Sequence, residues 1–161
     1  MNLMLYGNSC SGKTTFMKIL AKSNYTAIPT GDLTRQLYSF GCKNMPVIVQ
    51  NIIANLSKDR EYVFDHFYIH TCEQLHDLFS EWPTVIHVID RRTEPTFHSQ
   101  DPDKIKRKQA RFNWQADEIE RWLKDNDVPV VIVYNTDYGF DVSELIEHGI
   151  LDYNTRVMLK P

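Results

Sequence analysis

The stretch Gly7-Asn8-Ser9-Cys10-Ser11-Gly12-Lys13-Thr14 decides the fold that we predict for this chain. Its spacing, a glycine, four residues and then Gly-Lys-Thr, is typical of a loop that binds phosphate groups. The apolar residues 3–6 before it indicate a buried strand, and residues 15–21 after it indicate the first turns of a helix. Glycines let the backbone turn its N–H groups towards an anion, and the helix N-terminus adds a positive dipole end. We therefore expect residues 7–14, with Thr15, to bind a nucleoside triphosphate.

Two side chains at the end of this 7–14 loop have specific expected roles. Lys13 would contact the terminal phosphates as a point charge, and Thr14 would hold Mg²⁺ through its hydroxyl. The alternative is a glycine turn in front of a helix, without a ligand. The motif predicts ATP and Mg²⁺ as ligands, but it does not specify a reaction.

The composition of the whole chain indicates one ordinary globular domain, residues 1–161. It has 161 residues, of which 42% are hydrophobic and 24% charged, and a net charge of −3. This charge gives no footprint for duplex nucleic acid, and no apolar run approaches the ~20 residues of a membrane span. No signal peptide is visible, and Cys10, Cys42 and Cys72 lack metal-type spacing. Reduced thiols and a cytoplasmic location are therefore expected.

Continuous apolar runs alternate with helical patterns along the chain. Such runs are typical of a parallel sheet that helices cover on both faces. The expected strands are 3–6, 25–28, 62–64, 84–89 and 128–134, and a tail after the helix at 142–148 could add an edge strand. The other helices are expected within 33–40, 46–56, 72–79 and 103–126. The predicted fold is α/β: a three-layer sandwich of the P-loop NTPase type, with about five parallel strands and a short lid.

Ligands of such sheets bind beyond the carboxyl ends of the strands. We therefore expect the segments that follow strands to meet at one rim. These segments are the 7–14 loop, 30–32, 65–67, 90–92 and 135–137.

The segment Thr30-Gly31-Asp32-Leu33-Thr34-Arg35 resembles the Thr-Gly-Asp-x-x-Arg segment of adenylate kinases. The turn at 41–46 (Gly-Cys-Lys-Asn-Met-Pro) resembles the turn that follows in the same family. The resemblance implies that helices within about 31–58 bind the acceptor, and that Arg35 binds the phosphate of an acceptor mononucleotide. The planar guanidinium suits two phosphate oxygens at once. The alternative is that Thr30 and Asp32 cap a helix and Arg35 is solvated.

The segment Val63-Phe64-Asp65-His66-Phe67 resembles the Asp-Gly-Phe-Pro-Arg segment of adenylate kinases and the Asp-Arg-Tyr or Asp-Arg-Phe segment of thymidylate kinases. The resemblance implies that Asp65 lies near Mg²⁺, usually with water between them. No arginine follows Asp65 within this stretch, however, and His66, Ile69 and His70 stand where either family would supply a cation. Gln74 lies near the position of the base-reading glutamine, although a helix-surface glutamine is an equal interpretation.

Residues 91–111 are expected to form a short lid over the transferred phosphate. Cations that close over the phosphoryl group accelerate its transfer, and a closed lid excludes water. Arg91 and Arg92, at a strand end, are the first candidates, and Arg107 is the candidate on the helix that follows. The alternative is a solvated basic helix face. Lys104, Lys106, Lys108 and Arg111 complete the cluster.

The segment Asn135-Thr136-Asp137 would pack against the donor base, as the corresponding loop does in related kinases. A simple turn is an equal alternative, because Asn and Asp favour turns.

The sequence leaves three functions open. The leading one is a kinase of the nucleoside monophosphate kinase superfamily, which moves the γ-phosphoryl group of ATP to a nucleotide. The second is a P-loop kinase that phosphorylates a hydroxyl of a nucleoside, an oligonucleotide 5′ end or a small molecule, with Asp32 as general base. The Asp32-x-x-Arg35 spacing and the absence of an arginine after Asp65 favour the second. The third is a nucleotide-binding switch without turnover, which would gain less from lid cations.

Overall fold

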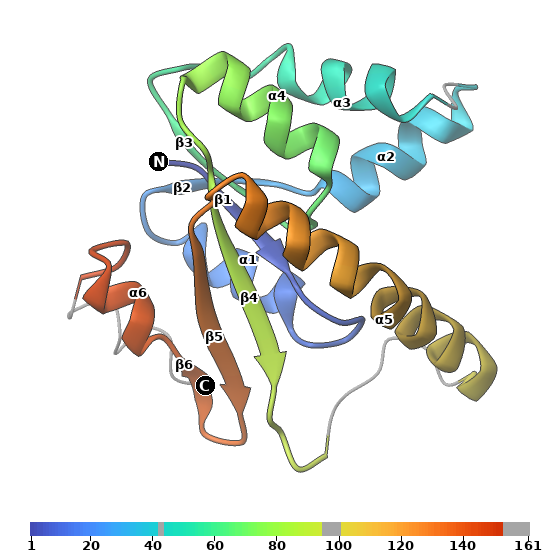
Figure 1. The fold of residues 1–161 in the computed structure, drawn as a ribbon, viewed down its shortest axis with the longest axis vertical. Helices are drawn as coiled ribbons and strands as arrows, with labels where there is room; N and C mark the ends of the chain where they lie inside the picture. The colour runs from blue at the N-terminus through green and yellow to red at the C-terminus, as the bar shows by residue number, and fades with distance from the viewer. Residues whose placement is uncertain (42–43, 95–100, 153–161) are drawn as a thin grey trace.

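A computed structural model describes residues 1–41, 44–94 and 101–152 of the chain. Within these ranges, helices and strands alternate along most of the chain (Figure 1). The elements are β1 (Leu3–Tyr6), α1 (Lys13–Leu20), β2 (Tyr25–Ile28), α2 (Thr30–Ser39), α3 (Met45–Ile53), β3 (Glu61–Phe64), α4 (Ile69–Phe79), β4 (Thr84–Asp90), α5 (Pro102–Asp125), β5 (Val130–Thr136), β6 (Gly139–Asp141) and α6 (Ser143–Glu147).

The strands form one sheet of six strands in the order β2-β3-β1-β4-β5-β6. β1 pairs in parallel with β3 on one side and with β4 on the other. From β1, the chain first forms β2 and β3 on one side of this strand and then β4, β5 and β6 on the other side. The direction in which strands are added therefore reverses at β1. Ligands of such sheets bind beyond the carboxyl ends of the strands at the reversal. The 7–14 loop leaves β1 at this position.

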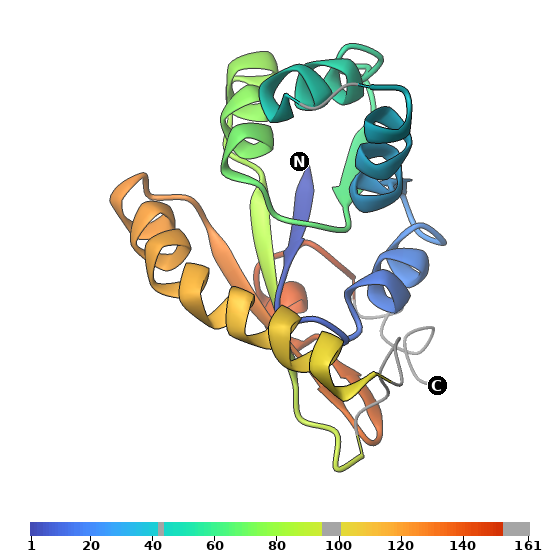
Figure 2. The same ribbon diagram turned by 90° about the vertical axis from the view of Figure 1, so that its right-hand side faces the viewer.

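Helices cover both faces of the sheet with two separate apolar cores. α1 and α6 pack on one face, where Phe16 and Leu145 are fully buried. α3, α4 and α5 pack on the other face with Ile48, Leu75 and Leu123, and α2 adds partly buried side chains. Figure 2 shows α1 and α5 on opposite sides of the strands. The central strands are buried on both faces, which explains their continuous apolar sequences. The chain is therefore α/β, with three layers and a mostly parallel sheet.

Several expected boundaries were wrong. α2 begins directly at Thr30 after Pro29, without a side-chain cap, so Thr30 and Asp32 do not cap this helix through their side chains. α4 begins at Ile69, earlier than expected, because the apolar pattern alone does not mark a helix start that lacks a capping side chain. β5 extends to Thr136, so Asn135 lies inside the strand and pairs with Asp90.

The expected parallel sheet of about five strands gains a sixth strand, β6, which runs antiparallel to β5. Three residues after a turn gave no strand pattern, so the sequence did not indicate β6. The expected edge strand in the tail after 148 falls mainly on residues 153–161, outside the described residues. Residues 42–43 of the expected 41–46 turn, with Cys42, and residues 95–100 of the expected lid also lie outside them.

Within the described ranges, none of the helices has both the length and the apolar composition that crossing a membrane requires.

Candidate functional site

The 7–14 loop has a backbone that few sequences could adopt. Gly12, just before α1, has φ 103°, and Cys10 has φ 64°, so both lie in the left-handed region. Gly7 packs against β4: a Cβ at this position would lie 2.5 Å from the carbonyl oxygen of Val88. Both glycines of the motif are therefore required by the local structure, one by its φ and the other by close approach.

Lys13 lies at the start of α1 and is 8% exposed. Its Nζ donates hydrogen bonds to the carbonyl oxygens of Gly7, at 2.8 Å, and Asn8, at 2.7 Å. Burial lowers the pKa of Lys13 to about 8, although the nearby Cys10 and Asp65 act in the opposite direction. The loop thus folds around a partly desolvated ammonium group, the charge that an anion in the loop would meet.

Polar contacts from β5 and β4 hold the loop in place. Asn135 on β5 donates from Nδ2 to the Ser11 carbonyl oxygen at 3.0 Å, and Arg92, after β4, donates to the Cys10 carbonyl oxygen at 2.8 Å. The Ser11 hydroxyl is buried and has no hydrogen-bond partner in the described part of the chain. Buried hydroxyls usually have a partner, so this group is available to a ligand in the loop. Asn135 was expected to contact the donor base; in the structure its side chain hydrogen-bonds to the backbone of the 7–14 loop.

The two arginines after β4 point in different directions. Asp90 accepts from Nε of Arg92 at 2.9 Å and from its terminal nitrogen at 3.0 Å. These hydrogen bonds raise the pKa of Arg92 and hold the pKa of Asp90 below its usual value, against the opposite effect of burial. Arg91 instead stacks its guanidinium on Tyr134, 3.6 Å from the ring centre. Of the expected pair, Arg92 therefore lies at the loop, and Arg91 lies against β5.

A second polar group collects beside the loop, between α2 and the end of β3. The buried carboxylate of Asp65 accepts from the Gly31 backbone N–H at 3.3 Å. Arg35 and Asp32 form an exposed ion pair within the first turns of α2. Burial lowers the pKa of His66, against the effect of Asp65, and Lys13 and Arg35 lower it further. His66 is therefore within electrostatic range of Lys13, Asp65, Arg35 and Asp32, as expected for residues on one rim.

Thr14 and Asp65 are the residues that the sequence predicts for Mg²⁺. Thr14 is exposed at the start of α1, and Asp65 has one carboxylate oxygen engaged with Gly31. Both offer hard oxygen ligands, which suit Mg²⁺. Among the described residues, no group of three or more His, Cys, Asp or Glu residues could hold a metal. A magnesium ion held by these two residues would therefore need phosphate oxygens and water to complete its coordination.

The cations of α5 do not join this site through any direct contact seen in the described residues. Arg107 and its basic neighbours Lys104, Lys106 and Lys108 are exposed. Arg111 is nearer: its charge lowers the pKa of Tyr68, as does that of Arg35, although burial raises this pKa overall. Arg111, which the sequence placed at the far end of the lid, is thus an α5 cation within electrostatic range of Tyr68, next to the second polar group.

Sequence reasoning missed an aromatic cluster beside the loop. Tyr6, the last residue of β1, lies 4.8 Å from His87, 5.3 Å from Phe112 and 5.9 Å from Phe67 between ring centres. The four residues come from β1, β4, α5 and the connection before α4. Only the aromatic residue directly before Gly7 could have hinted at them, because the cluster forms across four separate segments.

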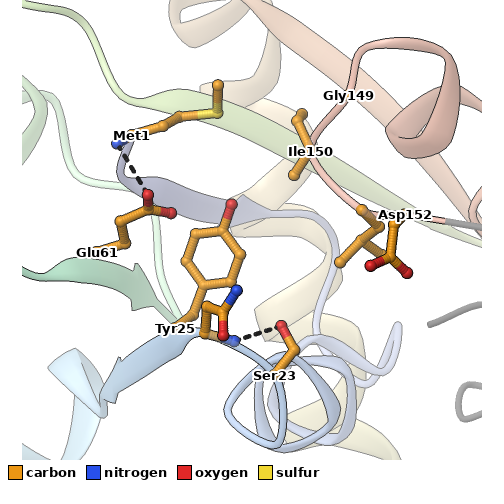
Figure 3. A pocket seen from close by; sticks show the side chains of 9 residues that line it. Met1, Ser23, Tyr25, Glu61, Gly149, Ile150 and Asp152 are labelled. Atoms are coloured by element: carbon orange, nitrogen blue, oxygen red, sulfur yellow. Dashed lines mark hydrogen bonds and ion pairs between the residues drawn. The ribbon is translucent and has the colours of Figure 1, made fainter. Parts of the chain in front are cut away.

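Two cavities lie away from this rim. One, of about 530 Å³, opens at the amino ends of β1, β2 and β3 and is lined by Tyr25, Glu61 and Asp152 among others (Figure 3). The other, of about 500 Å³, lies beside β2 between α2 and α3 and includes Leu37, Phe40 and Leu56. Neither includes a residue of the 7–14 loop, so the candidate site rests on the polar contacts at the carboxyl ends.

A scan of the chain against models of protein families found no match, and neither did a search of curated proteins. The resemblance to nucleoside monophosphate kinases therefore stays a prediction from the sequence.

Proposed function

We propose that this chain is an ATP-dependent kinase of the P-loop type, which transfers the γ-phosphoryl group to a nucleoside monophosphate. The observation that carries the proposal is the 7–14 loop. It follows the central strand, ends at a helix N-terminus and contains the buried ammonium of Lys13. Within the described ranges, the buried Ser11 hydroxyl has no hydrogen-bond partner. Backbone N–H groups at a helix N-terminus, a lysine and a hydroxyl are the groups that bind a polyphosphate.

The donor site would work by alignment and by charge neutralisation. In the transfer, an oxygen of the acceptor phosphate forms a bond to the γ-phosphorus, and the bond from that phosphorus to the β–γ bridging oxygen breaks. The electron pair stays on the bridging oxygen, and ADP leaves. Lys13 and Arg92 would neutralise charge on the phosphates, and Mg²⁺, held by Thr14 and Asp65, would supply further positive charge.

The acceptor side would use the second polar group. Arg35 would exchange its partner Asp32 for the acceptor phosphate, because a phosphate offers two oxygens and a larger charge. His66 is held neutral by burial and neighbouring cations, and a bound phosphate would favour its charged form. The histidine can thus replace the arginine that related kinases carry after this aspartate.

A second candidate function is transfer to a hydroxyl group. The observation that favours it is the position of Asp32, whose carboxylate is exposed on α2 rather than used as a helix cap. In this case Asp32 would take the hydroxyl proton while the oxygen bonds to the γ-phosphorus, and Arg35 would contact the phosphate.

The test is turnover of ATP against a panel of mononucleotides, nucleosides and 5′-hydroxyl oligonucleotides. We expect ADP formation that depends on a mononucleotide acceptor. Lys13→Met should abolish turnover, while Lys18→Met, on the exposed side of the same helix, should retain it. Reaction with hydroxyl acceptors alone would favour the second candidate. ATP binding without turnover on any acceptor would favour a switch instead.

A further inference from the structure

The hydroxyl of Tyr6 is buried at the edge of the candidate site without a hydrogen bond. Tyr6 is 5% exposed, and its Oη has no partner in the described part of the chain. Burial and the charges of Glu120 and Asp117 raise the pKa of Tyr6 to about 12, so the phenol keeps its proton at neutral pH. Buried polar groups nearly always have a partner, so an orphaned one calls for an explanation, and a functional contact is one such explanation.

Aromatic rings surround this hydroxyl. The rings of His87, Phe112 and Phe67 lie between 4.8 and 5.9 Å from that of Tyr6. Burial lowers the pKa of His87, so this ring is neutral as well at pH 7. Phe112 on α5 is only partly buried, so it is the ring of the cluster that a ligand could displace at the lowest cost in buried area. The cluster therefore offers flat, apolar surfaces around two uncharged hydrogen-bonding groups.

The cluster is linked to both polar groups of the site by chain neighbours and by electrostatic influence. Tyr6 directly precedes the 7–14 loop, and the charge of Lys13 acts on His87. Phe67 lies between His66 and Tyr68 in the sequence, and Tyr68 is influenced by Arg35 and Arg111. A molecule whose phosphate met Arg35 could therefore extend into the cluster.

The charged residues near the aromatic cluster determine which part of a bound molecule the cluster would accept. The carboxylates of Asp117 and Glu120 on α5 act on Tyr6, and they would repel a phosphate. Cations act instead on the Tyr68 side, through Arg35 and Arg111. The cluster therefore favours an uncharged, planar group, while the cationic side favours the phosphate.

We propose that the aromatic cluster binds the nucleobase of the acceptor in place of the Phe112 ring, and that Tyr6 Oη hydrogen-bonds to this base. The inference rests on the proposed kinase function and names the residue that would distinguish a nucleotide from a bare sugar phosphate. A flat heteroaromatic ring stacks on such side chains, and its ring nitrogens or carbonyl oxygens accept from a phenol.

The test compares nucleoside monophosphates with ribose 5-phosphate, which has the same sugar and phosphate but no base. Binding is measured by the rise in melting temperature with ligand concentration, which needs no turnover. For the wild-type chain we expect tighter binding of the nucleotide. Tyr6→Phe should weaken nucleotide binding roughly 2- to 12-fold, the range of one neutral hydrogen bond, and leave ribose 5-phosphate unchanged.

Tyr6→Phe should also raise the melting temperature of the ligand-free protein by roughly 2–4 °C, because an unpaired buried hydroxyl is removed. Tyr25→Phe is the matched control. Tyr25 is buried to a similar extent at the amino end of β2, where its hydroxyl hydrogen-bonds to the Glu61 side chain. Both residues line the cavity in Figure 3. This variant should be less stable and bind both ligands normally.

Unchanged nucleotide binding by Tyr6→Phe would overturn the inference, as would equal binding of nucleotide and ribose 5-phosphate by the wild-type chain. A titration with ATP separates this failure from failure of the kinase proposal. If ATP binds and the acceptor panel reacts while Tyr6→Phe behaves normally, only the inference about Tyr6 is wrong. If ATP does not bind, the kinase proposal itself is wrong, and the inference that rests on it falls too.

Discussion

Lys13 combines burial with a charge, and this combination makes protein stability depend on pH. Its pKa is lowered from 10.5 to about 8 in the folded chain. Between these values the unfolded chain binds the proton and the folded chain does not, so stability rises with pH across this window. Below about pH 8 both states are protonated, and the desolvation penalty is fully present.

We therefore expect wild-type protein to gain stability relative to Lys13→Met between pH 8 and 10, at up to about 1.4 kcal/mol per pH unit. The comparison isolates Lys13 from Cys72, Tyr6 and Tyr25, whose raised pKa values lower stability in alkali in both proteins. Urea unfolding at several pH values measures the difference. The stability difference between wild type and Lys18→Met should not change with pH. If the stability difference between wild type and Lys13→Met is also constant, the pKa of Lys13 is not lowered.

Asp32 separates the two candidate reactions at the scale of one side chain. For a mononucleotide acceptor, Asp32→Asn should change the rate only modestly, because the acceptor phosphate needs no base. For a hydroxyl acceptor, loss of the base should slow the reaction roughly 10²-fold or more. Steady-state rates with both acceptor types give the answer, with Asp59→Asn as an exposed control. A hydroxyl-directed rate equal to that of the wild type would rule out Asp32 as the base.

Sequence reasoning identified the residues that fix the local backbone of the loop and missed those whose surroundings depend on distant packing. Gly7, Gly12 and Lys13 follow from a motif of eight residues, and the structure requires both glycines at their positions. For Asp32, by contrast, the sequence left two roles open, a helix cap and a general base. In the structure the Asp32 side chain does not cap α2. The aromatic cluster around Tyr6 could not be predicted, because Phe112 contacts Tyr6 from far along the chain.

At the scale of elements, β5 connects the outer part of the sheet to the 7–14 loop. Asn135 reaches from this strand to the Ser11 carbonyl oxygen and lies against Gly12. Without the amide, this carbonyl loses its partner, and the loop loses one of its supports. Loss of a buried hydrogen-bond partner costs about 1–3 kcal/mol.

Asn135→Ala should therefore lower protein stability by this amount and also weaken ATP binding several-fold. Asn126→Ala is a matched control, because Asn126 likewise donates its amide to a backbone carbonyl, that of Trp122, far from the loop. It should lose some stability and keep its affinity for ATP. Urea unfolding and ATP titration check the two effects. Equal ATP affinity in both variants would show that Asn135 does not support the binding conformation.

The strands were easier to predict than the helix starts. Strand 3–6 is a continuous apolar run, and strand 84–90 is mostly one, because both faces of the sheet are covered around them. The starts of α2 and α4 lack side-chain caps, so the usual sequence signals were absent there. β6 is too short to show a period and exists only because β5 provides an edge.

At the scale of the whole molecule, the face of the sheet that carries α2 to α5 contains two neutral histidines. Burial lowers the pKa values of both His66 and His87 below 6.5. The unfolded chain takes up protons near pH 6.5 while the folded chain does not, so folding stability falls as the pH drops below this value. The pKa values of Asp90 and Asp137 are lowered from 3.8, so protonation of these two carboxylates reduces folding stability only at more acidic pH.

We expect the urea midpoint to fall between pH 7 and pH 5.5, and a His66→Gln/His87→Gln variant to show a smaller fall. His148→Gln, at an exposed position after α6, should behave like wild type. A bound acceptor phosphate should reverse part of the effect, because it favours the charged form of His66. A midpoint that does not change with pH in this range would contradict the neutral state of both histidines.

The hydrogen bonds from Lys13 to Gly7 and Asn8 have a consequence for selectivity among anions. In the free protein these carbonyl oxygens compete with any ligand for the ammonium group. Chloride or bicarbonate brings a single charge and cannot satisfy the loop N–H groups, the Ser11 hydroxyl and Lys13 together. A triphosphate brings several charges along an extended chain and can replace both carbonyls at once. The free loop would thus set an affinity threshold, so that the abundant small anions of a cell leave the site open for its proposed substrate.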